Sequence, residues 1–341
     1  MNTRMAAIGL CTSIMMAASG LPKVGSSQEL FRGWAIQAAD KSGANGAEIS
    51  SPGFSATNWL PTTVPSTVMA ALVQNGIHKA PLFGKNLDAI SPEPFKQGWW
   101  YRTEFTADNL DPDLGDGTHT RLRFDGLNYR ADIWLNGKKI ANRETIVGAF
   151  RTFDLEISTG LRKGVNALAV EVFPPQPGDF TMGFVDWNPL PPDRNMGIFR
   201  EVKLNRTAGV AIEDLCVRTQ VNLKTLKEAT LEIGGDLVNL DDRILTGTLK
   251  GAIGGIHFQV PYTLKPRERK ALRLSPEQVP ALRIRNPRLW WPHTLGKAEL
   301  YTLKLSVLEG PRLSDTQSVR FGIRQVGDYI NEQGHRGYTV N

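Results

Sequence analysis

The 341-residue sequence contains only two cysteines, which argues against a disulfide-rich fold and a cysteine-based metal site. Cys11 lies in an apolar N-terminal run, so the mature chain is expected to keep Cys216 alone, and one thiol cannot form an internal disulfide. The five histidines are scattered and lack the spacing of metal ligands. The sequence therefore predicts no metal site and no cofactor.

Long apolar runs and dense charge are also missing. No stretch beyond the N-terminus approaches the roughly 18 consecutive apolar residues that indicate a membrane-spanning helix. The net charge of +6 is spread along the chain, and its densest basic patch, Lys265–Arg273, is interrupted by Pro266 and Glu268. This pattern favours a solvated protein surface, so we expect neither a membrane span nor a nucleic-acid partner.

Residues 1–26 have the character of a secretory signal peptide. Arg4 supplies a positive charge, Ala6–Ala18 is an apolar run rich in small residues, and Ala18-Ser19-Gly20 is suited to cleavage. A disordered N-terminal tail is the alternative. The signal peptide predicts a secreted or periplasmic protein.

Residues 27–206 are predicted to form a jelly-roll β-sandwich, because short alternating segments are separated by glycine turns. Asn136-Gly137, between two such segments, is a strong hairpin signal. A short helix is expected at Thr67–Asn75, with Ser66 as its N-cap and Gly76 at its end. The other candidate strands are Glu29–Ile36, Trp99–Phe105, Arg121–Asp125, Thr152–Ile157, Asn166–Phe173 and Gly197–Asn205.

Residues 207–325 are predicted to form an immunoglobulin-like β-sandwich, since about seven strands in about 120 residues fit that fold. The glycine cluster at residues 251–255 has no helix after it, so a hairpin turn is favoured over a phosphate loop. Trp290 and Trp291 are expected to face opposite sides of a strand, one in the core and one towards a neighbouring domain. The candidate strands are Val210–Thr219, Ala229–Asn239, Leu245–Ile253, His257–Leu264, Lys270–Leu274, Leu300–Leu308 and Thr316–Phe321.

The segment Gly183–Leu204 combines a loop with a strand. Three prolines within residues 189–192 cannot donate to a sheet, so this part must be a loop. Asp186 and Trp187 place a carboxylate and a large ring in it. A ring can pack on the apolar face of a sugar while a carboxylate accepts hydrogen bonds from its hydroxyls. From these residues alone, a packed loop with a core Trp187 and a turn-capping Asp186 remains open.

The sequence resembles glycoside hydrolase family 2 over nearly the whole mature chain. The motifs that carry the resemblance occur in the order and spacing of the family. They are VPSTVMAAL (64–72), GWWYRTEF (98–105), RLRFDGLNYRADIWLNGKKI (121–140), GLRKGVNALAVEV (160–172), GIFREVKL (197–204), NPRLWWPHTLGKAELYTLKL (286–305) and FGIRQV (321–326).

This resemblance implies an all-β fragment in which a galactose-binding-like jelly roll and an immunoglobulin-like sandwich precede a (β/α)8 catalytic barrel. Residues 326–341 look like the lead-in to that barrel, and the chain ends within an apparent strand, as a truncated chain would. The family mechanism is retaining and uses two carboxyl groups on barrel strands. Because a barrel needs roughly 250 residues, no catalytic residue is expected in this chain, and its missing barrel is an expected partner.

Within the family, DWNPLPPDRNMGIFR (186–200) most resembles the exo-β-D-glucosaminidase branch, which releases glucosamine from chitosan ends. The β-mannosidase branch has a similar Asp-Trp loop and is the nearest alternative. A β-galactosidase and a stand-alone carbohydrate-binding β-sandwich are the others. The resemblance implies that Asp186 and Trp187 contact the terminal sugar of an oligosaccharide, although Asn188 stands where the mannosidase pattern has glycine.

Overall fold

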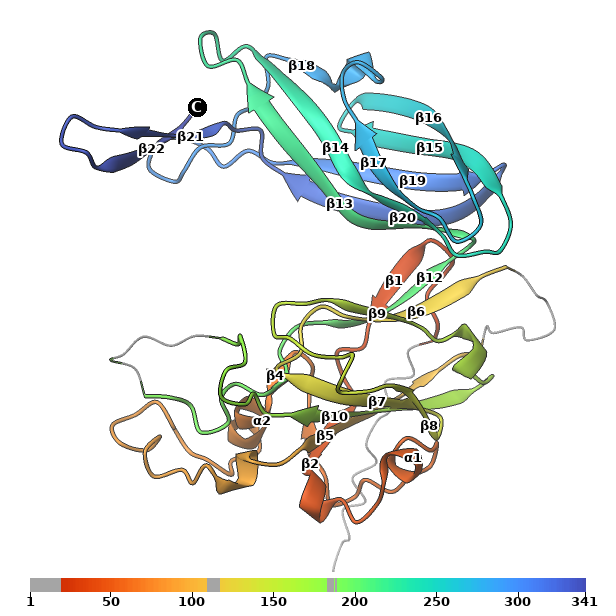
Figure 1. Ribbon diagram of the computed structural model, residues 1–341, viewed down its shortest axis with the longest axis vertical. Helices are drawn as coiled ribbons and strands as arrows, with labels where there is room; N and C mark the ends of the chain where they lie inside the picture. The colour runs from red at the N-terminus through yellow and green to blue at the C-terminus, as the bar shows by residue number, and fades with distance from the viewer. Residues whose placement is uncertain (1–19, 109–116, 183–186, 188) are drawn as a thin grey trace, which may run out of the picture. The chain divides into compact units, whose positions relative to one another are not determined.

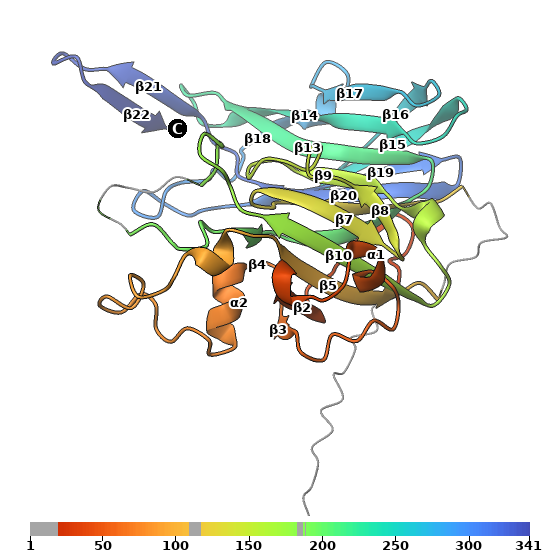
Figure 2. The same cartoon turned by 60° about the horizontal axis from the view of Figure 1, so that its bottom comes forward.

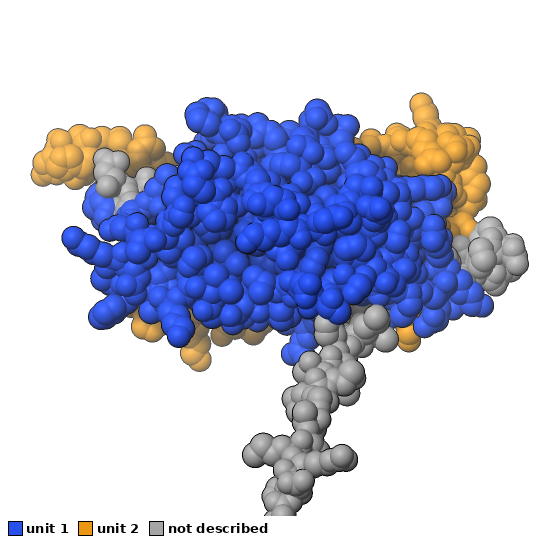
Figure 3. Space-filling view, turned by 90° about the horizontal axis from the view of Figure 1, so that it is seen from below, with its two compact units in different colours: residues 1–21, 29–112, 122–204 blue, residues 22–28, 113–121, 205–341 orange. Residues whose placement is uncertain are grey.

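The computed structural model describes residues 20–108, 117–182, 187 and 189–341, and almost all of its regular structure is β-strand. The chain divides into two compact units (Figure 3). The first unit comprises the described residues of 1–21, 29–112 and 122–204. The second comprises those of 22–28, 113–121 and 205–341.

A six-stranded antiparallel sheet organises the first unit (Figure 1). In spatial order its strands are β3 (Leu60–Thr62), β2 (Trp34–Ala38), β5 (Trp99–Thr106), β10 (Val165–Phe173), β7 (Arg130–Leu135) and β8 (Lys138–Ala141). A second sheet has the order β1 (Ser26–Glu29), β12 (Val202–Thr207), β6 (His119–Phe124) and β9 (Phe153–Glu156). The core of the unit includes the fully buried Tyr101, Phe105 and Phe124. The predicted all-β sandwich is confirmed.

The predicted hairpin at Asn136-Gly137 is confirmed. Both residues have positive φ, 51° and 85°, as a two-residue turn between β7 and β8 requires. Two other predicted strands are each split. Glu29–Ile36 divides between β1 and β2, which belong to different sheets. Gly197–Asn205 divides into β11 (Gly197–Ile198) and β12, because its two ends also pair in different sheets.

The predicted helix is α2 (Val68–Gln74), but its N-cap is Thr67 and not Ser66. The Thr67 side chain accepts a hydrogen bond from the backbone N–H of Ala70 at 3.1 Å. Ser66 and Thr67 form the short strand β4, which pairs with β11. This pairing sets where the helix can begin, and Gly76 follows its end with φ +71°.

A second, unpredicted helix, α1 (Gly46–Ile49), lies near β10, β7 and β8 (Figure 2). Asn45 caps it: its side chain accepts from the N–H groups of Ala47 and Glu48, while Glu48 accepts from the Asn45 N–H. Ile49 packs with Trp59 and Trp100 in a small core of its own. Within the described part of the chain, the 3₁₀ turns are η1 (Ala39–Lys41), η2 (Glu93–Phe95), η3 (Ser158–Gly160) and η4 (Pro280–Leu282).

The second unit has two antiparallel sheets, as the predicted sandwich requires. One contains β13 (Val210–Val221), β14 (Glu228–Asn239) and β17 (Arg269–Leu274), with β18 (Arg283–Arg285) also paired to β14. The other has the order β16 (Ile256–Leu264), β15 (Leu245–Ile253), β19 (Tyr301–Glu309) and β20 (Arg312–Phe321). Gly254 and Gly255 join β15 to β16, which confirms the predicted hairpin turn. The core between the sheets includes Leu249, Ile233 and Leu305.

The expectation that one of Trp290 and Trp291 lies in the core is wrong, because neither side chain belongs to the core of this unit and both are half-buried. The alternation argument fails since residues 286–300 contribute isolated bridges and not a continuous strand. Trp290 packs over Gly322, and the Arg324 guanidinium lies 4.3 Å from the centroid of its ring.

Residues 326–341 form a separate hairpin of β21 (Val326–Ile330) and β22 (Arg336–Val340). Its register places Val326, Ile330 and Tyr338 on one face, and all three are exposed. No helix among the described residues has the length and apolar character needed to cross a membrane.

Candidate functional site

Of the two residues predicted to contact a sugar, the structure describes one. Asp186 lies outside the described residues. The side chain of Trp187 is 82% exposed, so the alternative of a core tryptophan is wrong. Leu190, in the same segment, is also exposed. The segment thus presents a large ring to solvent instead of packing it inside the first unit.

One buried side chain binds both ends of this segment. Asn128 is fully buried, and its Oδ1 accepts a hydrogen bond of 2.7 Å from the hydroxyl of Thr181, before the segment. Its Nδ2 donates to the backbone carbonyls of Arg194 (3.0 Å) and Asn195 (2.9 Å), after the segment. The Asn128 backbone also exchanges two hydrogen bonds with Gly197. The described residues on either side of this segment, Thr181 before it and Arg194 and Asn195 after it, are therefore joined through one amide group.

A buried carboxylate fixes the C-terminal end of the loop to helix α2. Asp193 is 1% exposed and accepts hydrogen bonds from the backbone N–H groups of Met69 (2.9 Å) and Asn195 (3.0 Å). Burial raises the pKa of Asp193, and these hydrogen bonds offset part of that effect. The backbone of Val68 adds a bond to the carbonyl of Met196. The loop end is thus tied to the first turn of α2 by side chain and backbone.

An ion pair lies just before Thr181, on the N-terminal side of the segment. Arg130 donates two hydrogen bonds to Asp179, of 2.5 and 2.7 Å. These bonds lower the pKa of the Asp179 carboxyl. The bidentate geometry holds the backbone just before Thr181 in place.

Two exposed aromatic rings lie at this end of the loop. Phe150 and Phe180 are 64% and 80% exposed, and their ring centroids are 5.6 Å apart. Phe180 stands between Asp179 and Thr181, which are the two residues bonded to Arg130 and Asn128. An exposed ring pair on a restrained backbone is a surface on which a sugar ring can stack.

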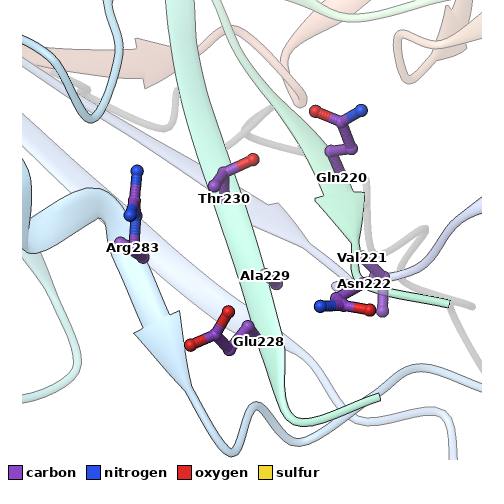
Figure 4. A pocket seen from close by; sticks show the side chains of 7 residues that line it. All are labelled: Gln220, Val221, Asn222, Glu228, Ala229, Thr230 and Arg283. Carbon is purple, nitrogen blue, oxygen red and sulfur yellow. The ribbon is translucent and has the colours of Figure 1, made fainter. Parts of the chain in front are cut away.

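Two neighbouring hollows adjoin the loop and share residues of its C-terminal part. Their volumes are about 260 and 320 Å³, and both are lined by Pro92, Pro192 and Arg194. A further hollow of about 250 Å³ lies in the second unit (Figure 4). It is lined from β13, β14, β18 and the turn that follows β13 by Gln220, Val221, Asn222, Glu228, Ala229, Thr230 and Arg283. It holds no aromatic ring, and none of its residues belongs to the predicted site.

The roles of Asn128, Arg130 and Asp193 were not predicted from the sequence. The first two lie within the motif RLRFDGLNYRADIWLNGKKI, and Asp193 lies in the loop itself, yet no spacing rule links residues so far apart in sequence. Among the described residues, no group of three or more His, Cys, Asp or Glu could hold a metal ion.

Comparison with known proteins identifies both units. Residues 34–178 match the family described as glycosyl hydrolase 2 galactose-binding domain-like, and residues 210–324 match glycosyl hydrolases family 2. The chain belongs to glycoside hydrolase family 2. The two matches place the galactose-binding-like domain of this family before its β-sandwich domain, in the order expected from the sequence motifs.

The relatives in family 2 with high similarity are named exo-β-D-glucosaminidases. That of Streptomyces avermitilis is 36% identical over 92% of this chain, and that of Amycolatopsis orientalis is 33% identical over 91%. The crystal structure of the Amycolatopsis orientalis exo-chitosanase superposes with a TM-score of 0.84 at 32% identity, over 93% of this chain. A mannosylglycoprotein endo-β-mannosidase of Lilium longiflorum is 28% identical over 92% of it. The chain spans only about a third of the length of these relatives, from 29% to 36%.

Proposed function

We propose that this chain is the N-terminal accessory part of an exported retaining glycoside hydrolase that releases terminal β-linked glucosamine from chitosan oligosaccharides. The observation that carries the proposal is the match of more than nine-tenths of the chain to exo-β-D-glucosaminidases. The endo-β-mannosidase relative is less similar, at 28% against 36% identity. The substrate class is therefore an amino sugar at a chain end.

In this proposal the chain binds and positions the sugar but does not cleave it. A retaining glycosidase needs two carboxyl groups about 5–5.5 Å apart across the scissile bond. In family 2 these groups come from the catalytic barrel and not from the two β-sandwiches. The 341-residue chain alone is therefore expected to leave aryl β-glucosaminides intact.

The β21–β22 hairpin supports an association with that barrel. A two-stranded hairpin is at best marginally stable by itself. Val326, Ile330 and Tyr338 nevertheless expose apolar surface on one of its faces, which a partner would need to cover. We assign the partner to the catalytic barrel of the same protein, since the relatives extend well beyond the matched third.

Asp186 and Trp187 are proposed to contact the terminal sugar at the mouth of the barrel. The exposure of Trp187 supports this role, because its ring is available for stacking. In the longer natural protein, Asp186→Ala should reduce kcat/KM on chitosan oligosaccharides by about 10–150-fold. This range corresponds to about 1.5–3 kcal/mol for a hydrogen bond to a charged group.

Trp187→Ala should also weaken substrate use, and it should keep the stability of the wild type within about 0.5 kcal/mol because the Trp187 side chain is exposed. Leu190→Ala is the matched control, since it shortens another exposed side chain of the same segment. Wild-type kinetics in Asp186→Ala and Trp187→Ala would remove both residues from the site.

A second candidate function is a stand-alone carbohydrate-binding β-sandwich protein. The exposed Phe150–Phe180 pair favours it, because such a pair could stack on a glycan without any contribution from a barrel. Titration of the 341-residue chain with chitosan oligosaccharides separates the two. Tight binding that is lost in Phe180→Ala supports the stand-alone module, and weak binding supports the accessory role.

Export is part of the proposal. Residues 1–26 carry the features of a signal peptide. N-terminal sequencing of the protein recovered outside the cytoplasm should begin at or just after Ala18-Ser19-Gly20. A cytoplasmic protein that retains Met1 would contradict this part of the proposal.

A further inference from the structure

We propose that Asn128 is a positioning residue: it joins Thr181 to Arg194 and Asn195, and thereby sets where Trp187, which lies between them in the chain, is presented. This role deepens the proposed function, since its consequence for sugar contact rests on that function. The link that Asn128 makes between Thr181 and residues 194–195 does not rest on the proposed function, because it concerns only how these parts of the chain are joined.

The geometry points to Asn128 because a single amide group is shared between segments 13 residues apart. Its oxygen binds the hydroxyl of Thr181 at 2.7 Å, and its nitrogen binds the carbonyls of Arg194 and Asn195 at 3.0 and 2.9 Å. Holding the ends of a loop together removes much of its conformational freedom. One side chain thus fixes the distance between the ends, and with it the space that Trp187 can reach.

The backbone that Asn128 binds has an unusual conformation. Arg194 and Asn195 both have left-handed φ values, 48° and 55°, and residues other than glycine adopt this region only when their surroundings favour it. Their two carbonyls both turn to the Asn128 amide. The buried N–H₂ group therefore stabilises a turn that the sequence Asp-Arg-Asn would not strongly prefer alone.

Replacing the amide of Asn128 by a carboxylate would turn its two hydrogen bonds to carbonyl groups into repulsive contacts. Asn128→Asp keeps the size and the oxygen that Thr181 binds, but it puts an oxygen opposite the carbonyls of Arg194 and Asn195. Because the site is fully buried, water cannot readily take over the missing hydrogen bonds. The C-terminal end of the loop would then lose its link to the N-terminal end.

Asn136 offers a matched control in the same unit. It is also a buried asparagine, and its Nδ2 donates to the carbonyl of Gly160 (2.9 Å) and to Asn166 Oδ1 (2.7 Å). Its Oδ1 accepts from the N–H of Ala167 at 3.0 Å. Asn136→Asp therefore makes the same chemical change in an equally bonded site that is not part of the loop.

The test measures amide hydrogen exchange in the 341-residue chain, with no sugar present. In Asn128→Asp, the backbone amides of residues 194–197 should exchange at least 10-fold faster than in the wild type, and in Asn136→Asp they should not. Thr181→Val is the milder variant if Asn128→Asp fails to fold. It removes only the hydroxyl on one side of the link and should raise the same exchange rates several-fold.

A spectroscopic measurement reports on Trp187 itself. The chain is labelled with 5-fluorotryptophan, and the ¹⁹F resonance of Trp187 is assigned by its absence in Trp187→Phe. This resonance should shift or broaden in Asn128→Asp and Thr181→Val and stay unchanged in Asn136→Asp. Unchanged exchange and an unchanged resonance in both loop variants, or equal changes in Asn136→Asp, would overturn the proposal. Neither measurement depends on whether the loop binds sugar.

Discussion

Replacing Gly197 by alanine should destabilise the first unit more than replacing a glycine that lies in an open turn, such as Gly76. Gly197 follows the candidate loop and pairs with both Thr67 and Asn128. Its φ is +141°, a conformation that L-residues rarely adopt. A Cβ atom here would lie 2.6 Å from the Tyr101 hydroxyl, 2.7 Å from Thr67 Cα and 2.8 Å from the Ser66 carbonyl oxygen.

The magnitude follows from two effects. A residue held in a sparsely populated backbone region is destabilised by about 1–3 kcal/mol. Overpacking adds about 1–3 kcal/mol, because two of the three contacts are backbone atoms that cannot rotate away. Together they give about 2–6 kcal/mol, or a fall in Tm of roughly 5–20 °C for a unit of this size.

Gly76→Ala separates the effect of backbone strain from the effect of overpacking. Gly76 has φ +71°, and a Cβ atom added to it would have no other atom within 4 Å, so only the strain remains, at about 1–2 kcal/mol. Differential scanning calorimetry of both variants gives the comparison. A Gly197→Ala protein as stable as Gly76→Ala would refute the reasoning from close backbone contacts.

Two further perturbations test other parts of the first unit. Thr67→Ala should lower the free energy of unfolding by about 1 kcal/mol, because Thr67 is the N-cap of α2. Ser66→Ala should lower it by clearly less. Urea titrations of both variants check this, and the reverse order would contradict the assignment of the N-cap. Burial alone would raise the pKa of Asp132, but hydrogen bonds from Arg143 and Lys139 outweigh it and lower that pKa. The stabilisation from this carboxylate is therefore complete above its ordinary pKa of about 3.9 and is lost as the pH falls below it. The stability difference between wild type and Asp132→Asn should shrink on acidification, and a constant difference would count against it.

Local chemistry accounts for what the sequence predicted well. Asn136-Gly137 specifies its turn through two residues that tolerate positive φ, so the hairpin needs no distant information. The strands of the second unit were found because one face of each is buried, which imposes alternation. The family motifs located both domains for the same reason, since they follow these strands and turns.

Long-range pairing accounts for the errors. Which sheet a strand joins depends on partners far away in sequence, so the breaks between β1 and β2 and between β11 and β12 left no local sign. The helix start moved from Ser66 to Thr67 because Ser66 pairs with Ile198. The role of Asn128 was invisible for the same reason, as its partners lie more than 50 residues away. Trp187 was singled out by its residue type and motif, and its exposure required the structure.

The most direct test of the account is the activity of the native gene product, immunopurified from the source cells with an antibody against this chain. The account predicts a product much larger than 37.6 kDa that hydrolyses p-nitrophenyl β-D-glucosaminide faster than the corresponding β-mannoside. A product no larger than 37.6 kDa that hydrolyses neither substrate would contradict it.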